Sequence, residues 1–120
     1  MSYKTSGNSG AFAWFYQRIT GIFLFVILLL HFTIMHFAGT GDVTFDVIKD
    51  RLADPYWKML DLSFVVFALY HGLNGIWMAI QDYIHSEGWR TVIYTLLVLL
   101  GLFLFFLAAV TLIPFGLGKI

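Results

Sequence analysis

The charged residues of this chain lie outside three long apolar runs. Asp, Glu, Lys and Arg are absent from residues 19–41, 62–81 and 91–118, which are runs of 23, 20 and 28 residues. A helix of about 20 apolar residues crosses the hydrocarbon core of a bilayer, so each run is long enough to span it. The alternative, buried helices of a soluble bundle, fails because the linkers carry too little polar surface to wrap them. We therefore predict an all-α membrane protein with three transmembrane helices, at about residues 19–39, 61–82 and 91–114.

Two linkers separate these runs. In the first, residues 40–61, apolar side chains recur at a spacing close to 3.6, at Val43, Val47, Ile48 and Leu52. This periodicity predicts a short amphipathic helix lying on the membrane surface, which Pro55 should end. The second linker, Tyr83–Arg90, is expected to be a short polar turn.

Composition narrows the class of protein further. The chain has 120 residues, of which 60% are hydrophobic and 12% charged, and a soluble domain of this size cannot hide so much apolar surface. Seven basic and seven acidic residues balance, which leaves no electrostatic case for a nucleic-acid partner. There is no cysteine for an iron–sulfur cluster, so a redox centre would be held by His or Met. Residues 1–12 are polar and unlike a signal peptide, and residues 1–120 are expected to form a single membrane domain.

The basic residues do not orient the chain in the membrane. Lys4, Arg18 and Arg90 would lie on one side, and Lys49, Arg51, Lys58 and Lys119 on the other. Three against four is no usable positive-inside signal. Charge alone therefore leaves both topologies open.

His71 and Asp82 form an informative polar pair at the second run. They are 11 residues apart. That separation is about three helical turns, so both side chains share one helix face about 16 Å apart. Ionisable residues inside a membrane usually mark an ion, proton or cofactor path. Gly72 and Gly75 leave room for a flat haem, whose iron takes a neutral His nitrogen, or let another helix pack closely with His71 hydrogen-bonded across the contact. Composition does not decide between the two.

His31 is a second candidate ligand, inside the first run. It follows Arg18 by 13 residues, which is about 20 Å along a helix. In an antiparallel second span, His71 would lie about 16 Å from the same surface. The two imidazoles are therefore expected at comparable depth, and we interpret His31 as a ligand rather than a structural histidine.

Arg18, Asp82 and Tyr83 are expected at one membrane boundary if the first two spans are antiparallel. Snorkelling and aromatic-belt chemistry explain most such residues, and the physics alone favours this ordinary interpretation. The functional alternative is a quinone or haem-propionate site. Tyr83 would then donate to a quinone carbonyl, Asp82 would relay protons and Arg18 would pair with a propionate.

Longer segments of the chain resemble a known family. The segments AWFYQRITGIFLFVILLLHFTIM and DPYWKMLDLSFVVFALYHGLNGIWMAIQDYI, followed by a short third span, are similar to the small hydrophobic membrane-anchor subunit of succinate dehydrogenase, of cytochrome b type. The most specific piece combines His71, Gly72 and Gly75 with the later pair Asp82 and Tyr83. The resemblance implies that His71 is an axial ligand of haem b, and that Asp82 and Tyr83 close the quinone site.

The resemblance also bears on the number of haems. Arg18, Gly21 and His31 follow the pattern of relatives with two haems, in which the first-span His serves the second haem and Arg18 would lie near propionates or quinone. Two geometries remain open. His31 and His71 could each pair with a histidine of a partner subunit, giving two haems, or both could ligate one haem between them. The family implies the first.

The same resemblance implies a role in a larger complex. The chain would be an anchor subunit of succinate:quinone oxidoreductase, forming half of a bundle with a second membrane-anchor subunit, and docking an iron–sulfur subunit and a flavoprotein subunit. Succinate would be oxidised on the flavoprotein, so no residue of this chain is expected to be catalytic. The implied location is the inner (cytoplasmic) membrane, with the N-terminus in the cytoplasm and the C-terminus outside. The alternatives are the anchor of a quinol:fumarate reductase and a haem-free proton-relay or assembly subunit.

Overall fold

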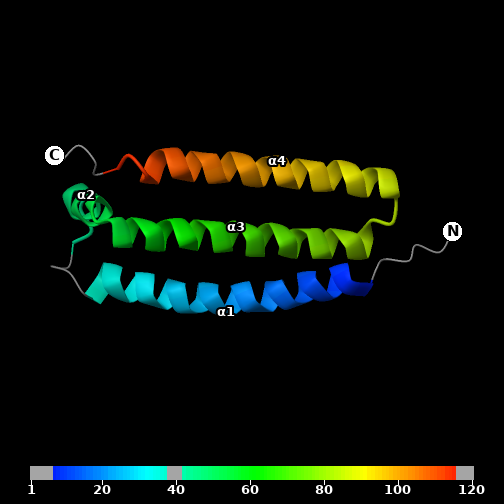
Figure 1. Cartoon of the computed structure of the whole chain (residues 1–120), viewed down its shortest axis with the longest axis horizontal. Helices are drawn as coiled ribbons and strands as arrows, with labels where there is room; N and C mark the ends of the chain where they lie inside the picture. Colours follow the sequence, from blue (N-terminus) through cyan, green and yellow to red (C-terminus); the bar gives the residue numbers. More distant parts are fainter. Residues whose placement is uncertain (1–6, 38–41, 116–120) are drawn as a thin grey trace.

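The computed structural model describes residues 7–37 and 42–115, and every regular element within these ranges is a helix. The helices are α1 (Gly7–Phe37), α2 (Phe45–Ala53), α3 (Pro55–Tyr83) and α4 (Glu87–Leu112). The three long helices lie side by side in one layer, with α3 in the middle (Figure 1). The prediction of an all-α protein is confirmed.

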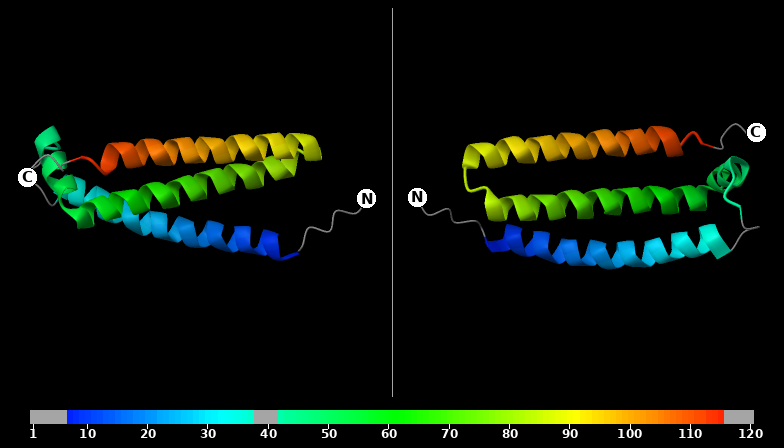
Figure 2. Two further views of the ribbon diagram at one scale, coloured as in Figure 1. Left: turned by 45° about the horizontal axis from the view of Figure 1, so that its top comes forward. Right: turned by 180° about the vertical axis from the view of Figure 1, so that it is seen from behind.

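Three helices are long and apolar enough to cross a membrane. The qualifying segments are Gly10–Phe37, Pro55–Tyr83 and Glu87–Leu112, with 28, 29 and 26 residues. The prediction of three transmembrane helices is therefore confirmed. Among the described residues, only Thr20, Ile27 and Leu52 are buried. Because the long helices form a single layer (Figure 2), their apolar side chains face outward, where lipid or another subunit can cover them.

Thr44 and Pro55 mark the boundaries of the short helix α2. The Thr44 hydroxyl accepts a hydrogen bond from a backbone N–H of the first turn at 3.4 Å, and the Asp54 carboxylate accepts from the Tyr56 N–H at 2.9 Å. Pro55 occupies the first turn of α3, where a missing N–H costs nothing, so it ends α2 as predicted. Val43 precedes the N-cap and lies outside α2, which corrects its inclusion in the predicted helix.

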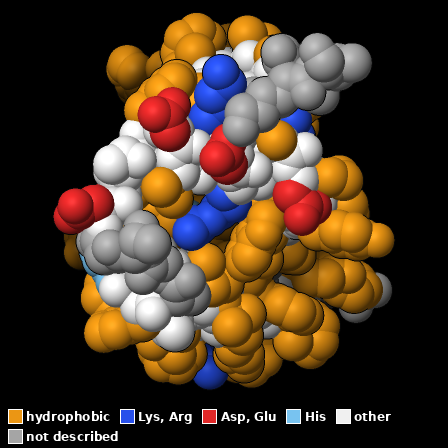
Figure 3. All heavy atoms as spheres, turned by 90° about the vertical axis from the view of Figure 1, so that its left-hand side faces the viewer, with side chains coloured by type: hydrophobic (Ala, Val, Ile, Leu, Met, Phe, Trp, Pro, Cys, Tyr) orange, Lys and Arg blue, Asp and Glu red, His pale blue; other side chains and the backbone are white. Residues whose placement is uncertain are grey.

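The helix α2 lies across one end of the layer rather than along it (Figure 2). It packs on α3, and Leu52 is its buried residue. Charged side chains gather at this end of the molecule, whereas apolar side chains surround them (Figure 3). This is the arrangement expected of an amphipathic helix at a membrane surface.

The connection between α3 and α4 is shorter than predicted. Only residues 84–86 are non-helical, whereas the sequence predicts a turn over Tyr83–Arg90. Glu87 lies in the first turn of α4, where the helix dipole stabilises a negative charge. The Arg90 guanidinium donates to two backbone carbonyls at the end of α3. The polar side chains that suggested a turn therefore stabilise two helix ends instead.

Helices α1 and α3 run antiparallel in a register determined by their side-chain contacts (Figure 1). The rings of Phe23 and Phe67 stack with their centroids 5.5 Å apart. On the other side of α3, Gly101 lets α4 approach, because a Cβ at that position would lie 2.6 Å from Leu73 Cδ1. The α1–α3 register decides which polar residues come together.

Candidate functional site

His71 lies at the α1–α3 interface, near the middle of α3. Its Nδ1 is 3.2 Å from the Gln17 carbonyl oxygen and 3.2 Å from the Thr20 hydroxyl oxygen. Gly21 allows this approach, because a Cβ there would lie 3.1 Å from His71 Cε1. Two polar groups of α1 therefore hold one nitrogen of the imidazole.

These contacts determine which nitrogen of His71 carries the proton. A carbonyl oxygen can only accept, and the Thr20 hydroxyl donates its hydrogen to the Tyr16 carbonyl at 2.7 Å. Both neighbours of Nδ1 are thus acceptors, so Nδ1 bears the hydrogen and Nε2 the lone pair. Within the described ranges, Nε2 makes no hydrogen bond. A neutral imidazole held at one nitrogen and free at the other is the usual form of a metal-ligating histidine.

The two glycines beside His71 have different surroundings. A Cβ at Gly75 would lie 3.0 Å from Gln17 Nε2, which donates to the His71 carbonyl at 3.1 Å. Of the two alternatives left open for Gly75, the structure therefore favours close packing of α1 on α3. A Cβ at Gly72 would have nothing within 4 Å. The backbone next to His71 is open on that side of α3.

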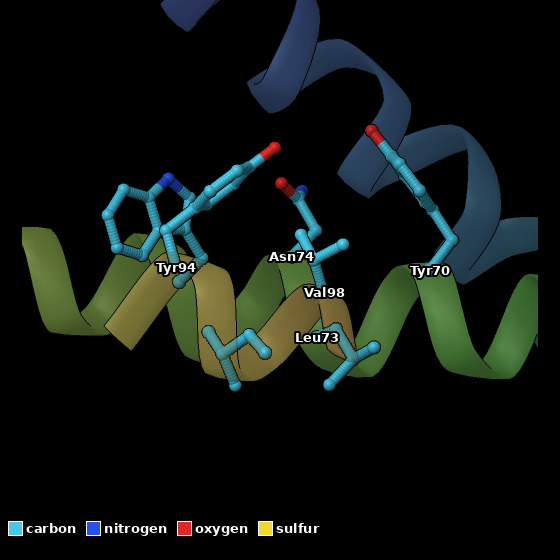
Figure 4. A pocket seen from close by; sticks show the side chains of 7 residues that line it. Tyr70, Leu73, Asn74, Tyr94 and Val98 are labelled. Atoms are coloured by element: carbon cyan, nitrogen blue, oxygen red, sulfur yellow. The ribbon is translucent and has the colours of Figure 1, made fainter. Parts of the chain in front are cut away.

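Two amide side chains, not anticipated from the sequence, join the site. Asn74 Nδ2 donates to Gln17 Oε1 at 2.8 Å, about one turn beyond His71. Asn74 also lines a cavity of about 210 Å³ between α3 and α4. The polar ends of Asn74, Tyr70 and Tyr94 point to the same side of this cavity (Figure 4). An amide three residues from a histidine in an apolar run was the signal that could have identified this group.

His31 has a carboxylate partner within this chain. Its Nδ1 lies 3.5 Å from Asp61 Oδ1, and its ring stacks on Phe64 with the centroids 5.9 Å apart. His31 is ten residues beyond Gly21, which contacts His71, so the imidazoles are about 15 Å apart along the helix axes. The expectation of comparable depth is wrong, and the two histidines cannot ligate one iron between them. Of the two geometries left open by the sequence, the one with a single shared haem is therefore excluded.

Arg18, Asp82 and Tyr83 do not form one cluster. The Arg18 guanidinium stacks on the Trp14 ring at 4.1 Å. The preceding residue, Gln17, contacts Asn74 of α3. Asp82 lies eight residues beyond Asn74, which is about 12 Å along the helix. Asp82 and Tyr83 are both exposed at the end of α3. The Arg18 backbone is therefore close to the level of Asn74, which corrects its expected place at one boundary with Asp82 and Tyr83.

Comparison with known proteins identifies the family of this chain. Residues 2–110 match the family described as the succinate dehydrogenase/fumarate reductase transmembrane subunit. The chain is 31% identical over 108 residues to the succinate dehydrogenase hydrophobic membrane anchor subunit of Thermoplasma acidophilum, a match that covers 83% of this chain and 88% of that protein. It is 34% identical over 98 residues to the subunit of the same name from Rickettsia felis, covering 80% and 76%. With its three membrane-crossing helices, the chain belongs to the succinate dehydrogenase/fumarate reductase transmembrane subunit family, as a multi-pass membrane anchor within an oxidoreductase complex.

Proposed function

We propose that the chain is a haem b-binding anchor subunit of succinate:quinone oxidoreductase. The observation that carries this proposal is the imidazole of His71, whose Nδ1 faces two acceptors of α1 and whose Nε2 is left as a ligand atom. The haem would supply a one-electron carrier inside the membrane. This chain would hold it through one histidine, and the opposite axial ligand would come from the second anchor subunit of the complex.

Two further residues near the depth of His71 suit a haem. The open backbone at Gly72 admits a flat group close to α3. Arg18 is exposed and lies one position after Gln17, which contacts the His71 backbone. Its guanidinium stacks on Trp14, about one turn further toward the Asp82 end of α3, where it would pair with a propionate through charge-assisted hydrogen bonds.

His31 is the proposed ligand of a second haem. It lies about 15 Å from His71 along the helix axes, far enough for each histidine to serve its own iron. Phe64 supports one face of the His31 ring, and Asp61 holds its Nδ1. Each haem would be completed by a histidine of the second anchor subunit.

Asp82 and Tyr83 are proposed to belong to a quinone site. Tyr83 is 84% exposed and Asp82 is exposed beside it, so both groups are accessible at the end of α3. The Tyr83 hydroxyl would donate to a quinone carbonyl, and Asp82 would pass protons to the reduced quinone. The second anchor subunit and the iron–sulfur subunit would complete the pocket. Electrons would come from succinate oxidised on the flavoprotein, so the dicarboxylate active site would lie outside this chain.

The single-layer arrangement of the helices supports a two-subunit bundle. A chain that buries only Thr20, Ile27 and Leu52 among its described residues has no interior of its own. Residues 1–120 would then form one domain in the inner membrane, completed by the second anchor subunit. The proposed topology has the N-terminus in the cytoplasm and Tyr83 on the same side, where the soluble subunits would dock.

The test is the haem content of the purified complex with single substitutions. We expect two haems per flavin in the unchanged complex, loss of one in His71→Leu and loss of the other in His31→Leu. His36→Leu is the matched control, because His36 is exposed on α1 against Phe32, and it should keep both haems. Full haem retention in His71→Leu would overturn the ligand assignment.

Two spectroscopic and kinetic controls separate the alternatives. If the reduced-minus-oxidised spectrum of the unchanged complex contained no b-type band, the haem proposal would be wrong. A haem-free relay or assembly subunit would then be favoured. Rates of quinone reduction by succinate and of fumarate reduction by quinol, measured on one preparation, distinguish a succinate dehydrogenase from a quinol:fumarate reductase.

A further inference from the structure

Asp61 is a carboxylate within the membrane-crossing helix α3, and its side chain is only 22% exposed. Its Oδ1 lies 3.5 Å from His31 Nδ1 across the α1–α3 interface. Arg51 of α2 interacts electrostatically with the same carboxylate. Because a charge inside a membrane is costly unless it is paired, these two basic partners explain how α3 tolerates an acid there.

The imidazole of His31 is constrained by two contacts. Its ring is parallel to the Phe64 ring, with an angle of 2° between the planes. When Asp61 is ionised, its carboxylate can only accept, so in a neutral His31 the nitrogen that faces it bears the hydrogen and Nε2 carries the lone pair. In the part of the chain that the structure describes, Nε2 of His31 has no polar partner.

His31 and His71 are thus both held at Nδ1, but the groups that face this nitrogen differ. In both rings Nδ1 faces an acceptor on the neighbouring long helix. At His71 the acceptors are a carbonyl and a hydroxyl, which are neutral. At His31 the acceptor is the carboxyl group of Asp61, which bears a negative charge when it is ionised.

We propose that Asp61 is a positioning residue for the second haem: its carboxylate orients the His31 imidazole and lowers the midpoint potential of that haem. The inference rests on the proposed role of His31 as a haem ligand. A carboxylate that accepts the imidazole N–H fixes the tautomer and raises the basicity of the ligating nitrogen. A more basic axial ligand beside a negative charge stabilises ferric over ferrous iron. The neutral acceptors at His71 lack this effect.

The experiment compares Asp61→Asn and Asp61→Leu in the complete complex, by redox titration of the haem bands and by haem content. Asn keeps the size and the acceptor oxygen but removes the charge. We expect Asp61→Asn to keep both haems. The preference of the second haem for the ferric state should weaken tenfold or more, which raises its midpoint potential by about 59 mV per factor of ten. Leu removes the acceptor as well, and retention of the same haem should fall by about 10- to 100-fold. Asp46→Asn, an exposed acid in the first turn of α2, is the charge control and should change neither haem.

The outcomes distinguish this inference from the proposed function beneath it. If His31→Leu removes one haem but both Asp61 variants leave its potential and content unchanged, Asp61 has no positioning role and the ligand assignment stands. If His31→Leu keeps both haems, the second haem site itself is wrong, and the inference falls with it. If Asp61→Leu instead disrupted the packing of the helices, the content of both haems would fall together. The selective rise in one potential in Asp61→Asn therefore decides the matter.

Discussion

Replacing Gly21 with alanine tests whether the α1–α3 contact orients His71. The new Cβ would lie 3.1 Å from His71 Cε1, whereas packed carbon atoms prefer about 3.5–4.0 Å. The imidazole must therefore retreat from α1 by about 0.5 Å. Both acceptors of its Nδ1 also lie on α1, at 3.2 Å, so a retreat of this size takes both contacts to about 3.7 Å, beyond hydrogen-bonding range.

The expected magnitude follows from the loss of one hydrogen bond, because Nδ1 carries a single hydrogen that its two acceptors share. Such a bond contributes about 0.5–1.5 kcal/mol net. That corresponds to roughly 2- to 13-fold weaker retention of a group ligated by His71, at about 1.4 kcal/mol per factor of ten. The assay is the rate of haem loss from the purified Gly21→Ala complex, followed by its reduced-minus-oxidised spectrum.

Gly10→Ala is the matched control for this substitution. It lies on the same helix, and a Cβ at that position has nothing within 4 Å. It should therefore lose haem at the unchanged rate, or more slowly if the added helix propensity stabilises α1. If Gly21→Ala retained haem as well as Gly10→Ala does, the claim that this contact holds His71 for ligation would be refuted.

Three further substitutions test other parts of the molecule. Tyr83→Phe should impair quinone reduction but spare succinate oxidation by an artificial acceptor; equal loss of both activities would count against the quinone role. Gln17→Leu leaves the Asn74 amide without its partner at 2.8 Å and should cost about 1–3 kcal/mol, seen as haem loss at a lower temperature; an unchanged temperature would contradict this. Asp54→Ala removes the acceptor of the Tyr56 N–H at 2.9 Å and should cost about 1 kcal/mol of stability, measured as a lower thermal midpoint with normal haem spectra.

The existence of the three spans and the end of α2 could be predicted because both depend on local properties. A run of 20 residues without charge is sufficient to identify α3 as a membrane helix, whatever surrounds it. Pro55 ends α2 because its ring and missing N–H act within one turn. The length of the α3–α4 connection was overestimated because it depends on a contact between two helices. Arg90 is polar but caps the end of α3 from within α4, and this contact depends on how two helices meet.

The depth of His31 could not be predicted, because it was measured from a charge taken as the membrane boundary. Helix α1 already extends 11 residues before Arg18, and the Arg18 side chain stacks on Trp14 within it. A long cationic side chain can lie along apolar surface, so its Cα does not mark the boundary. The prediction placed Arg18 and Asp82 at the same depth in the membrane. This assumption put the first helix in the wrong register with the second. The same shift concealed the partnership of His31 with Asp61.

The contacts of the glycines depend equally on the register. From the sequence, Gly75 could accommodate either a cofactor or another helix. The structure shows that Gln17 of α1 occupies the space beside it. Gly21 was noted as part of a sequence pattern, yet its physical role is to admit the His71 ring. The hydrogen bonds beside these glycines join residues 54 and 51 positions apart, and no local periodicity encodes such a pairing.

Because both imidazoles are oriented across one interface, the proposed ligation would depend directly on how α1 packs on α3. A shift of one residue in register would move α1 by about 1.5 Å along α3, enough to break the contacts at Nδ1 of His71 and of His31 at once. The stacked rings of Phe23 and Phe67 lie between the two histidine contacts and oppose such a slide. In the proposed complex, this pair of rings would help to position both ligands. The chain would then set the orientation of two ligands internally, and its two uncovered faces would leave the other half of each site to a second anchor subunit.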